Sequence, residues 1–524
     1  MKPRFIKLCS ITLILTIIVT SFCTLNISAT EIDGSFEHKP YMQSLFAKTE
    51  DINGVHFYGA TGDTPVDKAS MPDDIEVIDS LDEYIKYIND NQTSKKDIAT
   101  LSASNLPDSV DNSQSKFFPA IGNQGTLGSC TSWAQVYYQF TYTMNKEMNV
   151  ATTPDNTFSP QWAYNLVAGT GDMIGPYYNT YAFMKKQGNV FLNQVPYDFN
   201  ITSFSPTEDI WKTSIKYRIK DYQNFNNIGL EDSRITTAND EDLTLIKTAL
   251  NNGDVLAYST CIYSWQTTSI KTKSEISENN KFKGQYAVTS QIGENGPHRM
   301  TLVGYNDNIW IDVNNNNAVD NGEMGAFKIA NSWGSNYGNN GFMWIAYDAL
   351  NKESCVDGTT NDDSRRAIFE NISRIEVYPY NTGTDLYLRY TLNTCDRTQC
   401  RVYLDAEKDG TIYSTPAYSN EYGGSKLAYD GSTNATDATM VLLLSNAVEG
   451  ITADNLNEYT WRVRFEDTSE DGNIYTIKNA EIISEKDNKV YRPKDVYPIT
   501  LDGNSKEVML DGGGLETLRR DGYM

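Results

Sequence analysis

Histidine is scarce in this sequence: the 524 residues include only His38, His56 and His298. Histidine is the side chain whose ordinary pKa lies closest to neutrality, so acid–base chemistry in this chain has few histidines to use. His38 and His56 lie in a polar N-terminal segment that we expect to be removed from the mature protein. His298 therefore remains as the candidate for a catalytic histidine.

Basic residues are also in short supply: 44 Lys and Arg stand against 68 Asp and Glu, which gives a formal net charge of −24. A nucleic-acid surface needs clustered Lys and Arg to meet the phosphates. The charge balance therefore excludes nucleic acid as a partner and suits a soluble exported protein.

Long apolar runs are lacking too, except at the N-terminus. There, Lys2, Arg4 and Lys7 precede an apolar run, and the small residue Ala29 follows it. This order predicts a cleaved export signal over residues 1–29 and a secreted or cell-surface protein without membrane contact. Because the apolar run approaches spanning length, an uncleaved membrane anchor is the alternative.

Cysteine is uncommon, and of the seven cysteines Cys9 and Cys23 leave with the signal, so an odd number stays. In an oxidising compartment the remaining cysteines can form two bridges and leave one thiol. Cys395 and Cys400 flank a short polar turn, DRTQ, between two predicted strands. A bridge that closes this hairpin and two unbridged thiols are both compatible with the spacing.

The rest of the chain divides by pattern into four parts. Residues 30–104 are polar and contain one helical stripe, Ile78, Leu81, Ile85 and Ile88, followed by the exposed-looking TSKKDIATLSASN, which suggests a propeptide. Helical patterns followed by strand patterns over 105–371 predict an α+β domain. Short alternating strands over 372–510 predict an all-β sandwich, and 511–524 is expected to be a loose tail.

One stretch, NQGTLGSCTSWA, places Cys130 directly before a helical pattern. Apolar residues recur at spacings of three and four, in Trp133, Val136, Phe140 and Met144, so a buried helix should begin at or next to Cys130. The unpaired amides and positive dipole end of a helix favour thiolate over thiol. Cys130 is therefore a candidate nucleophile.

Partners for this thiol occur in two later strands and one earlier loop. His298 opens the strand in GPHRMTLVGY, and Asn331 and Trp333 end the strand in AFKIANSWG. An asparagine can orient the imidazole and an aromatic ring can shield their bond from water, while Gln124 and the Cys130 amide can face a developing oxyanion. Taken singly, each is also compatible with an ordinary core residue; together they favour catalysis.

These motifs, in this order, resemble the papain-like cysteine peptidases over about residues 105–370. The resemblance implies a two-lobed peptidase with Cys130 and His298 facing each other across a cleft, a propeptide lying through that cleft, and an acyl-enzyme intermediate without a catalytic cofactor. It also implies protein or peptide substrates, held by Gly128, Ser129, Gly175 and Trp333. Two departures are visible: Leu127 stands where the family usually has a cysteine, and Trp133 comes two places late.

A further motif, IDVNNNNAVDNGEMG, lies between the histidine and asparagine strands. Its oxygen-bearing residues fall at the positions of a calcium loop: Asp312, Asn314, Asn316, Ala318 through its carbonyl, Asp320 and Glu323. Asn317 takes the sharp-turn position that is usually glycine. A structural calcium ion is one interpretation, and an Asn-rich hairpin tip without an ion is the other.

The sequence thus predicts a secreted bacterial cysteine endopeptidase, made as a zymogen, with a C-terminal lectin-like accessory domain. The alternative is a surface adhesion or carbohydrate-binding protein that uses this Tyr- and Trp-containing domain to hold cell-wall or surface glycans. The domain can equally serve as a scaffold that only supports the peptidase.

Overall fold

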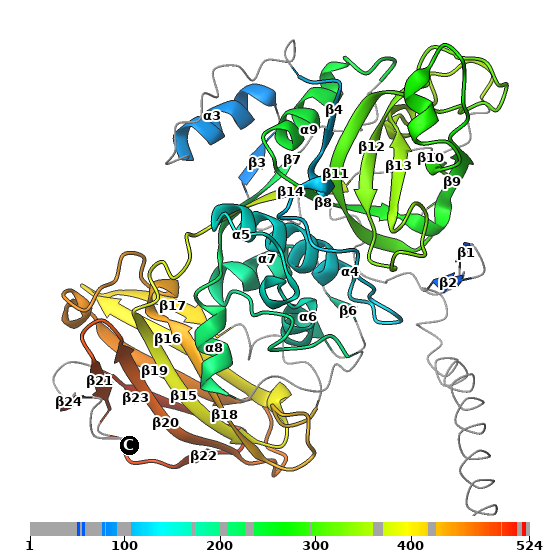
Figure 1. Cartoon of the computed structure of the whole chain (residues 1–524). Helices are drawn as coiled ribbons and strands as arrows, with labels where there is room; N and C mark the ends of the chain where they lie inside the picture. Colours follow the sequence, from blue (N-terminus) through cyan, green and yellow to red (C-terminus); the bar gives the residue numbers. More distant parts are fainter. Residues whose placement is uncertain are drawn as a thin grey trace, which may run out of the picture. The chain divides into compact units, whose positions relative to one another are not determined.

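The structure is a computed structural model that describes residues 50–52, 55–57, 76–78, 80–91, 106–169, 173–174, 177–198, 207–225, 235–293, 295–359, 370–417, 426–493, 495–510 and 516–519. The expected signal peptide lies outside these residues, as does most of the expected propeptide. Among the residues that are described, no helix has the length and apolar character needed to cross a membrane. The mixed helices and sheets confirm the α+β class (Figure 1).

The first large sheet has the strand order β3-β7-β14-β8-β11-β12-β13-β10-β9, and β4 pairs with β11 from outside this path. The strands are β3 Glu76–Ile78, β4 Ser109–Asp111, β7 Ile219–Phe225, β8 Leu256–Cys261, β9 Trp265–Ser269, β10 Tyr286–Gln291, β11 Pro297–Trp310, β12 Met324–Ala330, β13 Phe342–Ala346 and β14 Glu370–Val377. β11 is buried along most of its length because it has partners on both edges and helices against it. At Gly304 a Cβ would lie 2.2 Å from the Val110 carbonyl oxygen, so this close approach of β4 requires glycine.

Helices are present in this part, as the patterns over 105–371 predict. They are α4 Cys130–Ser132 continuing through the π-helical segment η6 Trp133–Phe140 into α5 Thr141–Glu147, then α6 Pro160–Val167, α7 Tyr177–Lys186, α8 Glu208–Ser214 and α9 Glu241–Asn251. α3 Leu81–Asn91 precedes them. Two short pairs complete this part: β1 Glu50–Ile52 with β2 Val55–Phe57, and β5 Ala168–Gly169 with β6 Met173–Ile174.

The C-terminal part consists of two antiparallel sheets, with the orders β18-β15-β20-β21-β24 and β17-β16-β19-β23, and with β22 on β20. Its strands are β15 Leu386–Thr394, β16 Cys400–Lys408, β17 Thr411–Pro416, β18 Thr436–Leu443, β19 Thr460–Asp467, β20 Tyr475–Ser484, β21 Lys489–Arg492, β22 Ile499–Leu501, β23 Ser505–Met509 and β24 Glu516–Arg519. Buried and partly exposed residues alternate in β15 and β19, and Tyr390 meets Phe465 edge-on at 6.3 Å across the two sheets. This is the face-to-face packing of a sandwich.

The expected boundary between the two parts falls inside β14. Because β14 pairs with β7 and β8, residues 372–377 belong to the first sheet and not to the sandwich. The expected tail contains β24, which pairs with β21.

Helices α7 and α8 carry the contact between the two parts. Gln187, just after α7, donates to the Val441 carbonyl at 3.2 Å, and Lys212 in α8 pairs with Glu485 at 2.7 Å. Apolar side chains of these helices and of both sandwich sheets form a single core cluster. The sandwich is therefore fixed to the helical part over a continuous apolar contact.

Candidate active site

Cys130 is the first residue of α4, as the helical spacing predicts. It is completely buried, and the helix begins with the bond from the Trp133 amide to the Ser129 carbonyl at 3.1 Å. In the part of the chain that the structure describes, the Ser129 side chain makes no capping hydrogen bond to this helix end. The next residues are π-helical, a geometry that often accompanies functional sites.

The helix of Cys130 packs directly against the strand of His298. α4 contacts β11, and the Thr301 hydroxyl donates to the Ala134 carbonyl at 3.3 Å. Thr301 follows His298 closely on β11, and Ala134 follows Cys130 closely on the helix. This contact therefore joins the strand that carries His298 to the helix that carries Cys130.

His298 is held by Asn331. Its Nε2 lies 2.8 Å from Asn331 Oδ1, and both side chains are buried. An amide oxygen only accepts hydrogen bonds, so Nε2 carries the proton of the neutral ring and Nδ1 is the basic nitrogen. Nδ1 is buried and has no hydrogen-bond partner among the described residues. It is thus the nitrogen that can take a proton from a thiol.

Burial of His298 disfavours its charged form. Desolvation lowers the pKa of His298 from 6.5 to about 4, and the hydrogen bond with Asn331 opposes this shift without cancelling it. The imidazole is therefore neutral near pH 7 and ready to act as a base. Because an imidazolium is costly in this site, it needs a nearby negative charge such as a thiolate.

Trp333 covers the pair. Its ring centroid lies 4.9 Å from that of His298, at an interplanar angle of 39°, and the side chain is 2% exposed. The backbone of Asn331 is fixed in turn. Its N–H donates to the Gly341 carbonyl at 3.0 Å, and its backbone carbonyl accepts from the Tyr138 hydroxyl at 2.8 Å. The ring shields the hydrogen bond from water, which keeps the local dielectric low.

Gln124 is tied to the same region. Its Oε1 accepts from the Ser332 hydroxyl at 2.6 Å, its backbone amide donates to the Ser332 carbonyl at 2.7 Å, and its Nε2 donates to the Leu127 carbonyl at 2.9 Å. The second Nε2 hydrogen is the one that could serve an oxyanion. Ser332 is a functional-site residue that the sequence analysis missed. The one sequence feature that points to it is its position next to Asn331.

The expected substrate-binding residues differ in setting. Gly128 and Ser129 are buried beside Cys130, and Ser129 Oγ shares a hydrogen bond with the Tyr197 hydroxyl at 2.6 Å. Gly175 lies outside the described residues.

The two departures from the papain-like pattern have local explanations. Leu127 is buried in the core of the helical part, so this position makes apolar contacts. Trp133 packs against Tyr137 at 4.5 Å and over Gly122, where a Cβ would lie 2.1 Å from its ring. The five cysteines of the described residues form no disulfide, so the bridge between Cys395 and Cys400 is not present.

The 312–323 loop turns sharply at Asn317. Asn317, at the sharp-turn position, has a φ of 59°, and its amide donates to Asp312 Oδ2 at 3.0 Å. Asp312 is 1% exposed, and its Oδ1 is buried without a hydrogen-bond partner in the described structure. This unpaired oxygen is the feature that fits a cation.

Other contacts of the loop compete with a cation. The Lys271 ammonium pairs with Asp312, and the amides of Asn314 and Asn316 both donate to Asp320 Oδ2, at 2.7 and 2.6 Å. Glu323 accepts from the Val313 amide, the Asp320 amide and the Trp310 indole. Across the described residues, no group of three or more His, Cys, Asp or Glu side chains could hold a metal ion.

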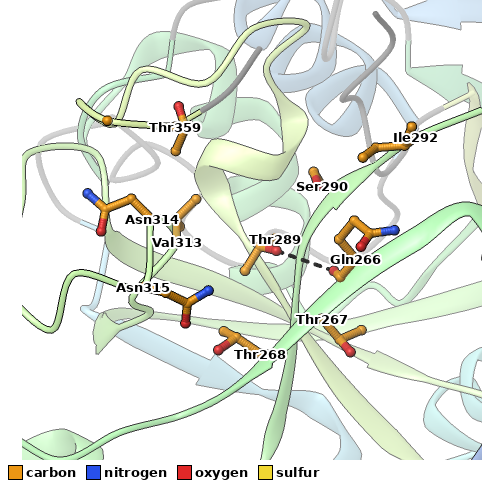
Figure 2. Close-up of a pocket in the computed structure, with 11 residues that line it drawn as sticks. Gln266, Thr267, Thr268, Thr289, Ser290, Ile292, Val313, Asn314, Asn315 and Thr359 are labelled. Carbon is orange, nitrogen blue, oxygen red and sulfur yellow. Dashed lines mark hydrogen bonds between the residues drawn. The ribbon is translucent and has the colours of Figure 1, made fainter. Parts of the chain in front are cut away.

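A pocket of about 340 Å³ lies beside this loop (Figure 2). Strands β9 and β10 form one wall with Gln266, Thr268 and Thr289, and Asn314 and Asn315 of the loop form another. The lining side chains are uncharged, and none belongs to the Cys130 site. The pocket is therefore separate from the catalytic groups.

No protein-family model and no curated protein sequence matches the chain. Among solved structures, xylellain, a cysteine protease from Xylella fastidiosa, is 16% identical, with 63% of this chain and 97% of that chain covered and a TM-score of 0.36. Digestive procathepsin L 3 of Tenebrio molitor larval midgut is 15% identical, covering 56% of this chain and 78% of its own, with a TM-score of 0.32. Procathepsin B S9 from Trypanosoma congolense is 12% identical, covering 61% and 86%, with a TM-score of 0.35.

Proposed function

We propose that this protein is a secreted cysteine endopeptidase that hydrolyses peptide bonds through Cys130, His298 and Asn331. The observation that carries the proposal is the buried Nε2–Oδ1 hydrogen bond, which leaves His298 Nδ1 as a base on the strand packed against the Cys130 helix. A core histidine with a structural role would normally have both nitrogens hydrogen-bonded.

The chemistry follows from these groups. Cys130 gives its proton to His298 Nδ1, and the thiolate, favoured by the helix end, attacks the scissile carbonyl carbon. The C–N bond breaks as the imidazolium protonates the departing amine, which leaves a thioester on Cys130. Water then loses a proton to His298 and attacks the thioester carbonyl carbon. The C–S bond breaks, the carboxylic acid leaves, and the imidazolium gives its proton to the Cys130 thiolate, which restores the thiol. The Cys130 amide and Gln124 Nε2 would stabilise the oxyanion of both steps.

The decisive experiment uses the chain from residue 30 onward. Self-processing and cleavage of a fluorogenic peptide are followed for the parent chain, for Cys130→Ala and for the control Cys395→Ala, which lies in the sandwich. We expect Cys130→Ala to abolish both activities and Cys395→Ala to retain them. Full activity of Cys130→Ala would refute the proposal.

A second role concerns the sandwich, which could hold cell-wall or surface glycans. The observation that favours it is the exposed Tyr413 on β17, 42% accessible and 6.3 Å from the ring of Tyr459. Aromatic faces of this kind bind sugar rings. Binding of the Cys130→Ala protein to cell-wall glycans, lost in Tyr413→Ala, would support this role, and no binding by either would leave the sandwich as a scaffold.

We also propose a structural calcium ion in the 312–323 loop, supported by the unpaired Asp312 Oδ1 and the left-handed Asn317. Asp312, Asn314, Asn316, Asp320, Glu323 and the Ala318 carbonyl would supply the oxygens. Binding would require Lys271 to leave Asp312, so calcium and this ammonium compete for one carboxylate.

A further inference from the structure

A short piece of the expected propeptide is built into the peptidase sheet. β3 runs parallel to β7, with Glu76 opposite Gln223 and Ile78 opposite Phe225, and so covers the outer edge of that strand. α3 follows β3 and packs against α9, as Figure 1 shows. An uncovered β7 would expose a row of unpaired backbone groups.

The helix buries a full apolar face in this position. Tyr84 and Ile88 are completely buried and Tyr87 is 8% exposed, within the same core cluster as α9 and the central strands. Tyr84 meets Phe225 edge-on at 5.6 Å. The face turns towards the two tyrosines, so Ile85, expected in the apolar stripe, is only partly buried.

Polar contacts then join α3 to two other places, the turn after α9 and strand β7. The Tyr84 hydroxyl donates to Asp254 Oδ2 at 3.0 Å and accepts from Asn252 at 3.1 Å. The Tyr87 hydroxyl accepts from Gln223 of β7 at 2.7 Å. These bonds are directional and at least partly buried, so they specify this segment and not merely any apolar helix.

Arg374 of β14 is enclosed by the segment. Its guanidinium pairs with Asp254 at 3.1 Å, donates to Gln223 at 2.8 Å, and lies 5.8 and 5.4 Å from the rings of Tyr84 and Tyr87. Loss of α3 would open this buried ion pair to water on one side and remove both rings. The peptidase sheet therefore depends on the segment for its own packing.

The segment is also remote from the catalytic strand. β7, β14 and β8 lie between β3 and β11 in the sheet order. At about 4.8 Å per strand, β3 is roughly 19 Å from β11, which carries His298. β3 is thus not a neighbour of the strand that carries His298.

We infer that residues 76–91 are a permanent component of the enzyme: the surface formed by β7, α9 and Arg374 retains this segment as a second chain after the chain is cut behind α3. The inference rests on the proposed function only in expecting such a cut. An active enzyme prepared without residues 76–91 would accordingly be unstable, whereas an inhibitory propeptide would leave a stable enzyme on release.

The test uses the full-length Cys130→Ala chain with a recognition site for a specific protease inserted between Lys95 and Lys96. After cutting, native mass spectrometry and gel filtration report whether the N-terminal fragment stays bound, and no peptidase activity is needed. We expect one fragment per enzyme in buffer and separation in urea. Failure of the proposed function would leave this result unchanged.

Two variants sharpen the test. The double substitution Tyr84→Ala and Ile88→Ala removes buried contacts and should release the fragment and lower the melting midpoint. The control Lys86→Ala changes an exposed residue of the same helix, so the fragment should stay bound to this variant. The inference is overturned if the cut parent fragment separates in native buffer while the remaining chain keeps its melting midpoint.

Discussion

Replacing Asn331 by alanine isolates the hydrogen bond on which the catalytic proposal depends. The substitution removes the partner of His298 Nε2, 2.8 Å away, and leaves a buried N–H unsatisfied. Such a loss costs about 1–3 kcal/mol. If the cost falls on the transition state, in which the imidazole must be charged and correctly aimed, it lowers kcat/KM about 5- to 150-fold.

The assay is kcat/KM on a fluorogenic peptide, with Asn193→Ala, an exposed position, as the matched control. A second readout is the pKa of His298, measured by NMR in a Cys130→Ala background. The bond with Asn331 raises this pKa against the effect of burial, so its removal should lower the pKa further. A folded Asn331→Ala protein with unchanged kcat/KM and an unchanged His298 titration would refute the orienting role.

Three other predictions follow from the same structure. Because burial lowers the pKa of His298 to about 4, the unfolded chain takes up a proton at this residue before the folded chain does as the pH falls. The free energy of unfolding of Cys130→Ala, measured in urea, should therefore decline by up to ~3 kcal/mol between about pH 6.5 and 4. A flat pH profile would contradict this, as would the same decline in the double variant Cys130→Ala, His298→Gln. Gln124→Ala should lower kcat about 10- to 1000-fold with little change in KM if its amide meets the oxyanion, and a change confined to KM would argue against that role. Removing calcium with a chelator should lower the melting midpoint by about 5–10 °C if the loop holds an ion. If the parent protein and Asp312→Asn both melt at the same temperature with and without chelator, Lys271 alone balances the charge of Asp312.

The helix that begins at Cys130 could be predicted because it depends on a local pattern. The spacing of Trp133, Val136, Phe140 and Met144 is a property of one helix, so the start of that helix at Cys130 could be inferred without any tertiary information. The order of the motifs around Cys130, His298 and Asn331 could likewise be recognised from the sequence alone.

Features that depend on pairing between distant segments could not be found in this way. The pattern of β14 is that of a strand in either part of the chain, and only its pairing with β7 and β8 assigns it to the first sheet. The buried face of α3 turned towards Tyr84 and Tyr87 because Asp254, Gln223 and the neighbouring strands offer partners for their hydroxyls. Tyrosine has both an apolar ring and a polar end, so periodicity alone does not decide whether it faces a core.

Under the proposed function, the loop between β11 and β12 would affect catalysis without touching the substrate. These strands pair with Thr301 opposite Ala330, and this register sets His298 on one strand against Asn331 at the end of the other. A shift of one residue would turn Asn331 to the opposite face of the sheet and break the Nε2–Oδ1 bond. Under the proposed function, the bonds that close the loop on Glu323 would support catalysis by resisting that shift. A variant that loosens the loop should accordingly reduce kcat more than it changes KM, because the substrate-contacting groups remain while His298 loses its orientation.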